Sequence, residues 1–177
     1  MKKSISPKKT ALLSLFLTFS VILGYVDALL PLHFLPIAGL KLGLSNLAIL
    51  LALELFSFKE AALISLLRIL VVHLLLFPSP NGLILSLCGG TLSLLAMTLF
   101  KRLRFPLPSV SIFGGMMHNI GQVLAAALLL KTPALLACLL WLLPLGALCG
   151  GLIGILASVL KNGLKKIPLF KNTFGKR

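Results

Sequence analysis

Six apolar blocks, each about as long as a bilayer is thick, constrain this chain more than any other feature. The blocks cover residues 10–30, 37–56, 60–77, 82–100, 110–130 and 134–160. Because an α-helix rises about 1.5 Å per residue, about 20 residues cross the roughly 30 Å of hydrocarbon in a membrane. The sequence therefore predicts an all-α integral membrane protein, with six transmembrane helices in one bundle.

The two ends of the chain differ in composition from the predicted bundle over residues 10–160. Residues 1–9 and 161–177 are basic, and we expect both segments in the cytoplasm. The basic start followed by an apolar stretch also resembles a signal peptide. The first block is long enough to span and lacks a convincing small-residue cleavage site, so a retained helix is expected.

Basic residues indicate the orientation of the bundle. The chain has 17 Lys and Arg residues against three acidic ones. With the amino terminus inside, the six-helix arrangement places only Lys41 and Lys131 outside and leaves Arg68 within a helix. The other fourteen basic residues fall inside: Lys2, Lys3, Lys8, Lys9, Lys59, Lys101, Arg102, Arg104, Lys161, Lys165, Lys166, Lys171, Lys176 and Arg177. This bias predicts a multi-pass cell-membrane protein with both termini cytoplasmic.

Several function classes lose support from the same composition. The net charge of +14 lies at the ends of apolar blocks, where membrane orientation explains it, so no nucleic-acid partner is expected. Cys88, Cys138 and Cys149 lie inside apolar runs without CxxC spacing, so they are expected to be packing residues. We expect neither a metal nor a cofactor.

Arg68 falls near the middle of the third block, where a charged group facing lipid is unfavourable. Two interpretations remain open: a structural ion pair, perhaps with Glu54, or a site for a ligand. The planar guanidinium suits a carboxylate, a phosphate or a carbonyl-bearing ring. Asp27 is expected near the outer interface, in contact with water.

The fifth block carries three polar side chains close to the predicted midplane: His118, Asn119 and Gln122. His118 and Gln122 share a helix face at i and i+4, and Asn119 lies three residues before Gln122. Such groups face either another helix, through hydrogen bonds, or an internal binding site. Both possibilities stay open, and substrate binding is the favoured one.

Three further polar residues are candidates for the same binding site. Lys41 and Asn46 flank Gly43 at the outer end of the second block, where the glycine permits an unwound backbone and Lys41 either contacts a ligand or snorkels to the interface. His73 follows Arg68 at a little more than one helical turn and would lie in the outer half of the same cavity.

Small residues at four-residue spacing predict close helix packing. Gly146, Gly150, Gly154 and Ser158 form such a row on the sixth block, and Ser14 and Thr18 form a shorter one on the first. Rows of this kind let another helix approach closely, either within the chain or in a partner subunit.

The chain resembles the Gx transporter family, also known as heptaprenyl diphosphate synthase component I, over residues 10–160. Four groups of residues carry the resemblance. They are the sequence GLKLGLSN at 39–46, FKEA at 58–61 with SLLR at 65–68, the pair Gly89-Gly90, and HNIGQ at 118–122. The family is similar to the substrate-binding S components of energy-coupling-factor transporters. The AxxxA docking row common on their first helix is replaced here by Ser14-xxx-Thr18 and Ser20-xxx-Gly24.

This resemblance implies a six-helix subunit that captures a small molecule, such as a vitamin or cofactor precursor, and is energised by partner membrane and ATPase subunits. The chain itself lacks a GxxxxGK[ST] phosphate loop. We expect no enzymatic activity, because three scattered acids cannot form the aspartate clusters that hold Mg²⁺ against a diphosphate. Two alternatives stay open: a non-catalytic accessory protein of isoprenoid or quinone metabolism, and a structural membrane scaffold.

Overall fold

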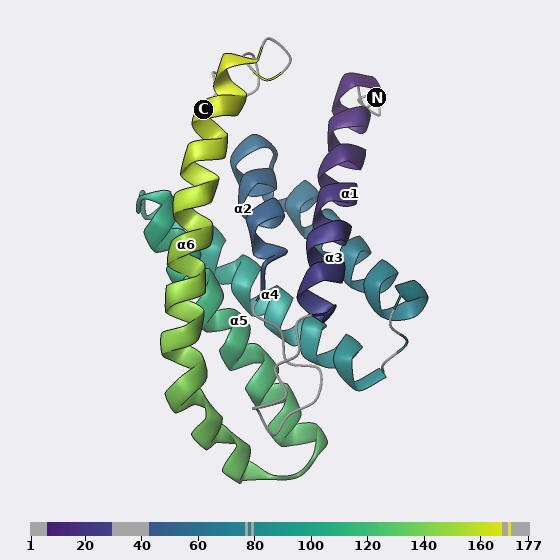
Figure 1. The fold of residues 1–177 in the computed structure, drawn as a ribbon, viewed down its shortest axis with the longest axis vertical. Coiled ribbons are helices and arrows are strands. Elements are labelled where there is room, and N and C mark those ends of the chain that lie inside the picture. Colours follow the sequence, from purple (N-terminus) through teal and green to yellow (C-terminus); the bar gives the residue numbers. More distant parts are fainter. Residues whose placement is uncertain (1–6, 30–42, 77, 79, 168–169, 171–177) are drawn as a thin grey trace.

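The computed structural model describes residues 7–29, 43–76, 78, 80–167 and 170 of the protein, and these residues form helices joined by short connections (Figure 1). The α-helices are α1 (Pro7–Leu29), α2 (Asn46–Leu55), α3 (Phe58–Val71), α4 (Pro80–Arg102), α5 (Leu107–Leu129) and α6 (Leu139–Lys166). A π-helical turn, η1 (Val72–Leu76), extends α3, and a 3₁₀ segment, η2 (Pro133–Cys138), leads into α6.

Four of these segments are long and apolar enough to cross a membrane. They are Pro7–Asp27, Pro80–Arg102, Leu107–Leu129 and Pro133–Lys166. The outer surface of α6 is strongly apolar, since Leu140, Trp141, Leu148 and Leu152 each expose about 70% or more of their area, as a lipid-facing helix would. The prediction of an all-helical membrane protein is confirmed at this level.

The second and third predicted spans differ from expectation. Helix α2 has 10 residues, which cover only about 15 Å, half of the hydrocarbon thickness. It begins at Asn46 because Gly43 adopts a left-handed φ of 82° and turns the chain, and residues 37–42 of the predicted block lie outside the described part. The third block, predicted over 60–77, lies in a helical stretch from Phe58 to Leu76 that carries Lys59, Glu60 and Arg68. Six full spans are therefore not established.

Helix α2 lies at the centre of the fold, between α1 and α6 (Figure 1). Nine of its ten residues are buried, and the tenth, Glu54, exposes only 10% of its side chain. An apolar cluster that includes Leu12 and Phe16 of α1, Ile64 of α3 and Ile153 of α6 encloses it. A short helix buried among other helices needs no contact with lipid, so its apolar run from Leu47 to Leu53 does not require a full span.

Ion pairs join several helix ends at one end of the bundle. Lys9 at the start of α1 pairs with Glu60 at the start of α3, with 2.5 Å between Nζ and Oε1. Glu54 at the end of α2 pairs with Lys101 of α4 at 2.8 Å and with Lys161 of α6. The same end holds both the start of α1 and the end of α6, and the α5–η2 connection lies opposite (Figure 1). Basic residues that the sequence assigned to the inner side thus gather at one end.

Candidate functional site

Helix α5 supplies two polar side chains that face α4. His118 and Gln122 are both almost completely buried, and the Gln122 side-chain N–H donates to Nε2 of His118. They fit against α4 because position 89 is glycine: a Cβ there would lie 2.8 Å from Cγ of Gln122 and 3.2 Å from Nδ1 of His118. The predicted i and i+4 pair is therefore present, and its imidazole and amide lie against the backbone of α4.

Asn119 points to a different neighbour. Its Nδ2 donates to the Leu142 carbonyl of α6 at 2.6 Å, and a Cβ on Gly146 would meet the same nitrogen at 2.6 Å. Helix α5 therefore turns Asn119 toward α6 while His118 and Gln122 turn toward α4. The sequence left two roles open for Asn119, a hydrogen bond to another helix and the binding of a ligand. The structure shows the hydrogen bond to another helix.

The turn before α2 covers His118. A Cβ on Gly43 would lie 3.3 Å from Cδ2 of His118 and 3.0 Å from Nδ2 of Asn46, so the predicted residue Asn46 is buried next to the imidazole. Lys41, the other predicted residue of this region, lies outside the described residues.

Asp27 holds this turn in place, contrary to the expectation that it contacts water. Only 2% of its area is exposed, and its Oδ2 accepts hydrogen bonds from the backbone N–H groups of Gly43 at 2.9 Å and Leu44 at 3.1 Å. Two N–H donors stabilise a buried carboxylate. The sequence offered a signal, because Ser20, Gly24 and Asp27 repeat at i, i+4 and i+7 and form one buried face of α1.

Arg68 lies between α1 and α4, and 3% of its area is exposed. Glycines make room on both sides: a Cβ on Gly24 would lie 3.2 Å from Cδ of Arg68, and one on Gly90 would lie 3.8 Å from Nη2. Neither Nε nor Nη2 has a hydrogen-bond partner among the described residues. Asp27 acts on the guanidinium electrostatically, whereas Glu54, the partner considered from the sequence, pairs with two lysines.

His73 continues this polar layer along the same helix. It lies in the π-helical turn, where Nδ1 donates to the Ile69 carbonyl at 3.0 Å and Nε2 forms a hydrogen bond with the Ser86 hydroxyl at 3.2 Å. The imidazole therefore links η1 to α4 and is buried. Single π-turns inside helices occur frequently at functional sites.

The Gly89-Gly90 pair of α4 connects the two halves of this arrangement. Gly89 contacts the His118 and Gln122 side, and Gly90 contacts Ile69, Ser65 and Arg68 of α3. Asp27 fixes the turn that covers His118, through its hydrogen bonds from the Gly43 and Leu44 N–H groups. Arg68, His73, Asn46, His118 and Gln122 thus belong to one buried polar layer.

The small-residue rows behave differently from each other. Gly146, Gly150 and Gly154 are buried against α5, and the hydroxyl of Ser158 donates to the Gly154 carbonyl at 2.9 Å. This row packs within the chain. Ser14 and Thr18, in contrast, are exposed on α1.

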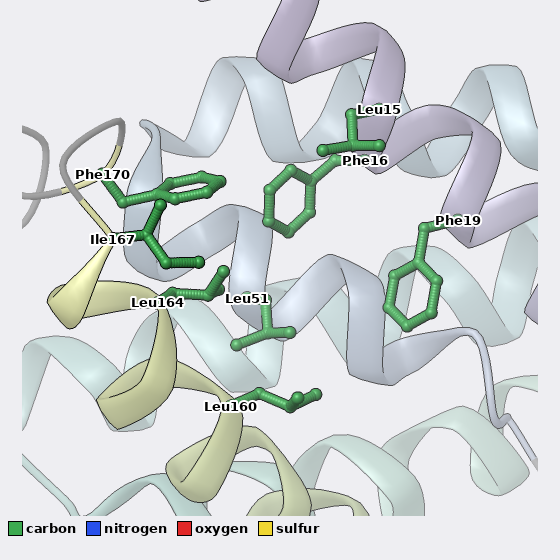
Figure 2. Close-up of a pocket in the computed structure, with 8 residues that line it drawn as sticks. All are labelled: Leu15, Phe16, Phe19, Leu51, Leu160, Leu164, Ile167 and Phe170. Carbon is green, nitrogen blue, oxygen red and sulfur yellow. The ribbon is translucent and has the colours of Figure 1, made fainter.

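Two of the cavities lined by described residues lie outside the polar layer. The larger one, about 400 Å³, opens between α1, α2 and the end of α6, and every side chain that Figure 2 shows around it is apolar. Its walls are Leu15, Phe16, Phe19, Leu51, Leu160, Leu164, Ile167 and Phe170. A crevice of about 240 Å³ between α3 and α4 has Ser65 and Gly90 among its walls, which places it beside Arg68.

No curated protein and no solved structure matches the chain. A family model, described as heptaprenyl diphosphate synthase component I, matches residues 16–160, which include every described residue of the polar layer. This match confirms the resemblance found in the sequence, and the chain belongs to the heptaprenyl diphosphate synthase component I family.

Proposed function

We propose that the protein is a membrane-embedded substrate-binding subunit that takes up or translocates a small molecule and is energised by partner subunits. The observation that carries the proposal is the Arg68 guanidinium, which is buried and has two N–H groups without a partner among the described residues. Buried polar groups are nearly always hydrogen-bonded. A ligand with acceptor atoms would complete this site.

The substrate-binding residues of the proposal are Arg68, His118 and Gln122, with Asn46 and His73 beside them. Lys41, which is outside the described residues, is included on the sequence alone. Asn119 contributes by fixing α5 against α6 through its hydrogen bond to Leu142. The exposed Ser14 and Thr18 of α1 remain a candidate contact for a partner helix.

We also propose that the chain has no catalytic activity of its own. Its three acidic residues are engaged separately: Glu54 and Glu60 with lysines, and Asp27 with backbone N–H groups. The family description favours one second candidate, a non-catalytic accessory protein of heptaprenyl diphosphate metabolism. Product formed from isoprenoid diphosphates by the purified chain alone would contradict both.

The binding proposal predicts that a small molecule copurifies with the protein after gentle detergent extraction. Mass spectrometry of the native chain should identify it, and adding it back should raise the melting temperature. Gln122→Leu should weaken this stabilisation, because the amide that donates to His118 is lost and the imidazole is left to reorient. Equal stabilisation of both proteins would place the ligand elsewhere, and stabilisation of neither would favour a scaffold.

The proposed orientation places the end that carries the ion pairs in the cytoplasm. In a background without Cys88, Cys138 and Cys149, we expect a cysteine at Arg102, at the end of α4, to resist a membrane-impermeant thiol reagent in intact cells. A cysteine at Thr132, in the α5–η2 connection, should react. Opening the membrane should make both reactive, and the reverse pattern in intact cells would invert the topology.

A further inference from the structure

The crevice between α3 and α4 opens on the outer surface of the bundle. Its rim includes Leu66 of α3 and Thr91 and Leu95 of α4, and all three side chains are exposed. Thr91 is the middle residue of α4, which is long and apolar enough to cross a membrane. An exposed side chain at the middle of a spanning helix faces lipid, so the crevice opens toward the hydrocarbon of the bilayer.

The floor of the crevice lies next to Arg68. Ser65, Ile69 and Gly90 are buried and belong to its walls. A Cβ on Gly90 would lie 3.8 Å from Nη2 of Arg68, 3.7 Å from Oγ of Ser65 and 3.0 Å from Cδ1 of Ile69. The missing side chain of Gly90 therefore leaves a point that the guanidinium and a hydroxyl both approach. The end of the Ile69 side chain, which can rotate, is the atom that narrows this point most.

The two groups of Arg68 that lack a partner form one fork. Nε and Nη2 have no hydrogen-bond partner among the described residues, and they lie on the same side of the planar guanidinium, so their N–H bonds are parallel. Nη2 is the end of this fork that lies closest to Gly90. An acceptor group that reaches the point beside Gly90 from the crevice would therefore satisfy buried donors that the described residues leave unpaired.

The size and the lining of the crevice suit an apolar group. Its volume of about 240 Å³ is below the roughly 300–1,000 Å³ of pockets that enclose a whole drug-sized molecule. Apart from Ser65, Gly90 and Thr91, its walls are apolar side chains. The crevice therefore takes one part of a ligand, an alkyl segment or a ring, and each CH₂ group buried there tightens binding by about fourfold.

We propose that the ligand of Arg68 is an amphiphile: its acceptor group binds the Arg68 fork beside Gly90, and its apolar part occupies the α3–α4 crevice, next to lipid. The inference rests on the proposed binding function and specifies the class of substrate. A molecule without an apolar part would gain nothing from the crevice.

The test compares probes that share an acceptor group and differ in their apolar part. Octanoate and octanamide each carry an alkyl chain, and acetate and acetamide are their short counterparts. Binding to the purified full-length protein is measured by equilibrium dialysis against detergent without protein, because the long probes also enter micelles. We expect at least one long probe to bind at least about tenfold more tightly than its short counterpart, since several CH₂ groups enter the crevice.

A matched pair of variants assigns this gain to the crevice. Leu66→Trp places an indole at the rim and should weaken binding of the long probe by about tenfold, while the exposed position should leave the fold unchanged. Leu63→Trp is the control, because Leu63 is also exposed on α3 but is not among the walls of the crevice. It should bind the long probe as the native chain does.

Two further variants test the position of the acceptor group. Gly90→Ala places a methyl group at the point between the crevice and Nη2, at the cost of moving only the end of Ile69, and should also weaken the long probe by about tenfold. Arg68→Leu should abolish binding of the long probe.

Two results would overturn the inference: long probes that bind no more tightly than their short counterparts, or equal binding of the long probe by Leu66→Trp and Leu63→Trp. The binding function is judged separately, by the copurified molecule and its dependence on Arg68. A copurified molecule without an apolar part, lost in Arg68→Leu and retained in Leu66→Trp, would sustain the function while contradicting the ligand class.

Discussion

Arg68→Leu should abolish binding of the copurified small molecule while leaving the protein folded. Two charge-assisted hydrogen bonds from the guanidinium contribute about 3–5 kcal/mol in total, which corresponds to a loss of affinity of at least about 100-fold. Arg68→Lys keeps the charge and loses the fork, so it should retain only part of the affinity. Titration calorimetry or ligand-dependent melting of the two variants measures the difference.

The effect of the same substitution on folding distinguishes a binding role from a structural one. A leucine fills the space that Gly24 and Gly90 leave for the arginine stem, and it removes a buried charge that is costly to desolvate. Asp27 keeps its two backbone donors. We therefore expect little change in thermal stability for Arg68→Leu, in contrast to the loss of several kcal/mol when a true buried ion pair is broken.

A double-mutant cycle with Asp27→Asn provides the control. If Arg68 is mainly the counter-ion of Asp27, Arg68→Leu destabilises the protein and the added Asp27→Asn restores much of the loss. If Arg68 is mainly a ligand-binding residue, the two substitutions are nearly additive in stability. Retention of the copurified molecule by Arg68→Leu, together with strong coupling in the cycle, would establish the structural role and remove the binding site.

The sequence predicted the features of the site that depend on neighbouring residues in one helix, and it missed those that depend on contacts between distant residues. The i and i+4 relation of His118 and Gln122, and the burial of Arg68, follow from helical periodicity and from the cost of polar groups in lipid. Asp27 was misplaced because its partners, the N–H groups of Gly43 and Leu44, lie 16 and 17 residues further along the chain. A contact between residues so far apart in the sequence cannot be recognised from the hydropathy of either segment.

The same reasoning explains the differences in the fold. Block lengths predicted the four long segments, because a span is a run of apolar residues. Hydropathy cannot separate a span from a short helix such as α2, which is apolar because protein surrounds it. Glu54 was considered for Arg68 on charge alone, but it lies at the end of the bundle with Lys101 and Lys161.

Two adjacent glycines of α6 should respond in opposite ways to the same added methyl group. A Cβ on Gly150 would lie 2.5 Å from the Ser111 carbonyl oxygen and 2.9 Å from Cα of Ile112, both backbone atoms of α5 that cannot move aside singly. We expect Gly150→Ala to lower the free energy of unfolding by about 1–3 kcal/mol through overpacking. Chemical unfolding in detergent measures this loss.

Gly151→Ala is the matched control, one residue further along the same helix. Its Cβ would meet only side-chain atoms of Ile112, at 3.7 Å and 3.8 Å, which is ordinary contact. Alanine also favours the helix by up to about 1 kcal/mol, so this variant should be neutral or slightly stabilised. Equal stability of the two variants would contradict the close approach of α5 and α6. A different outcome is a Gly150→Ala protein that keeps its free energy of unfolding but no longer forms an oligomer. That result would assign the glycine row to contact with a partner chain. If the row packs within the chain, the added methyl group separates α5 from α6 and must destabilise the monomer.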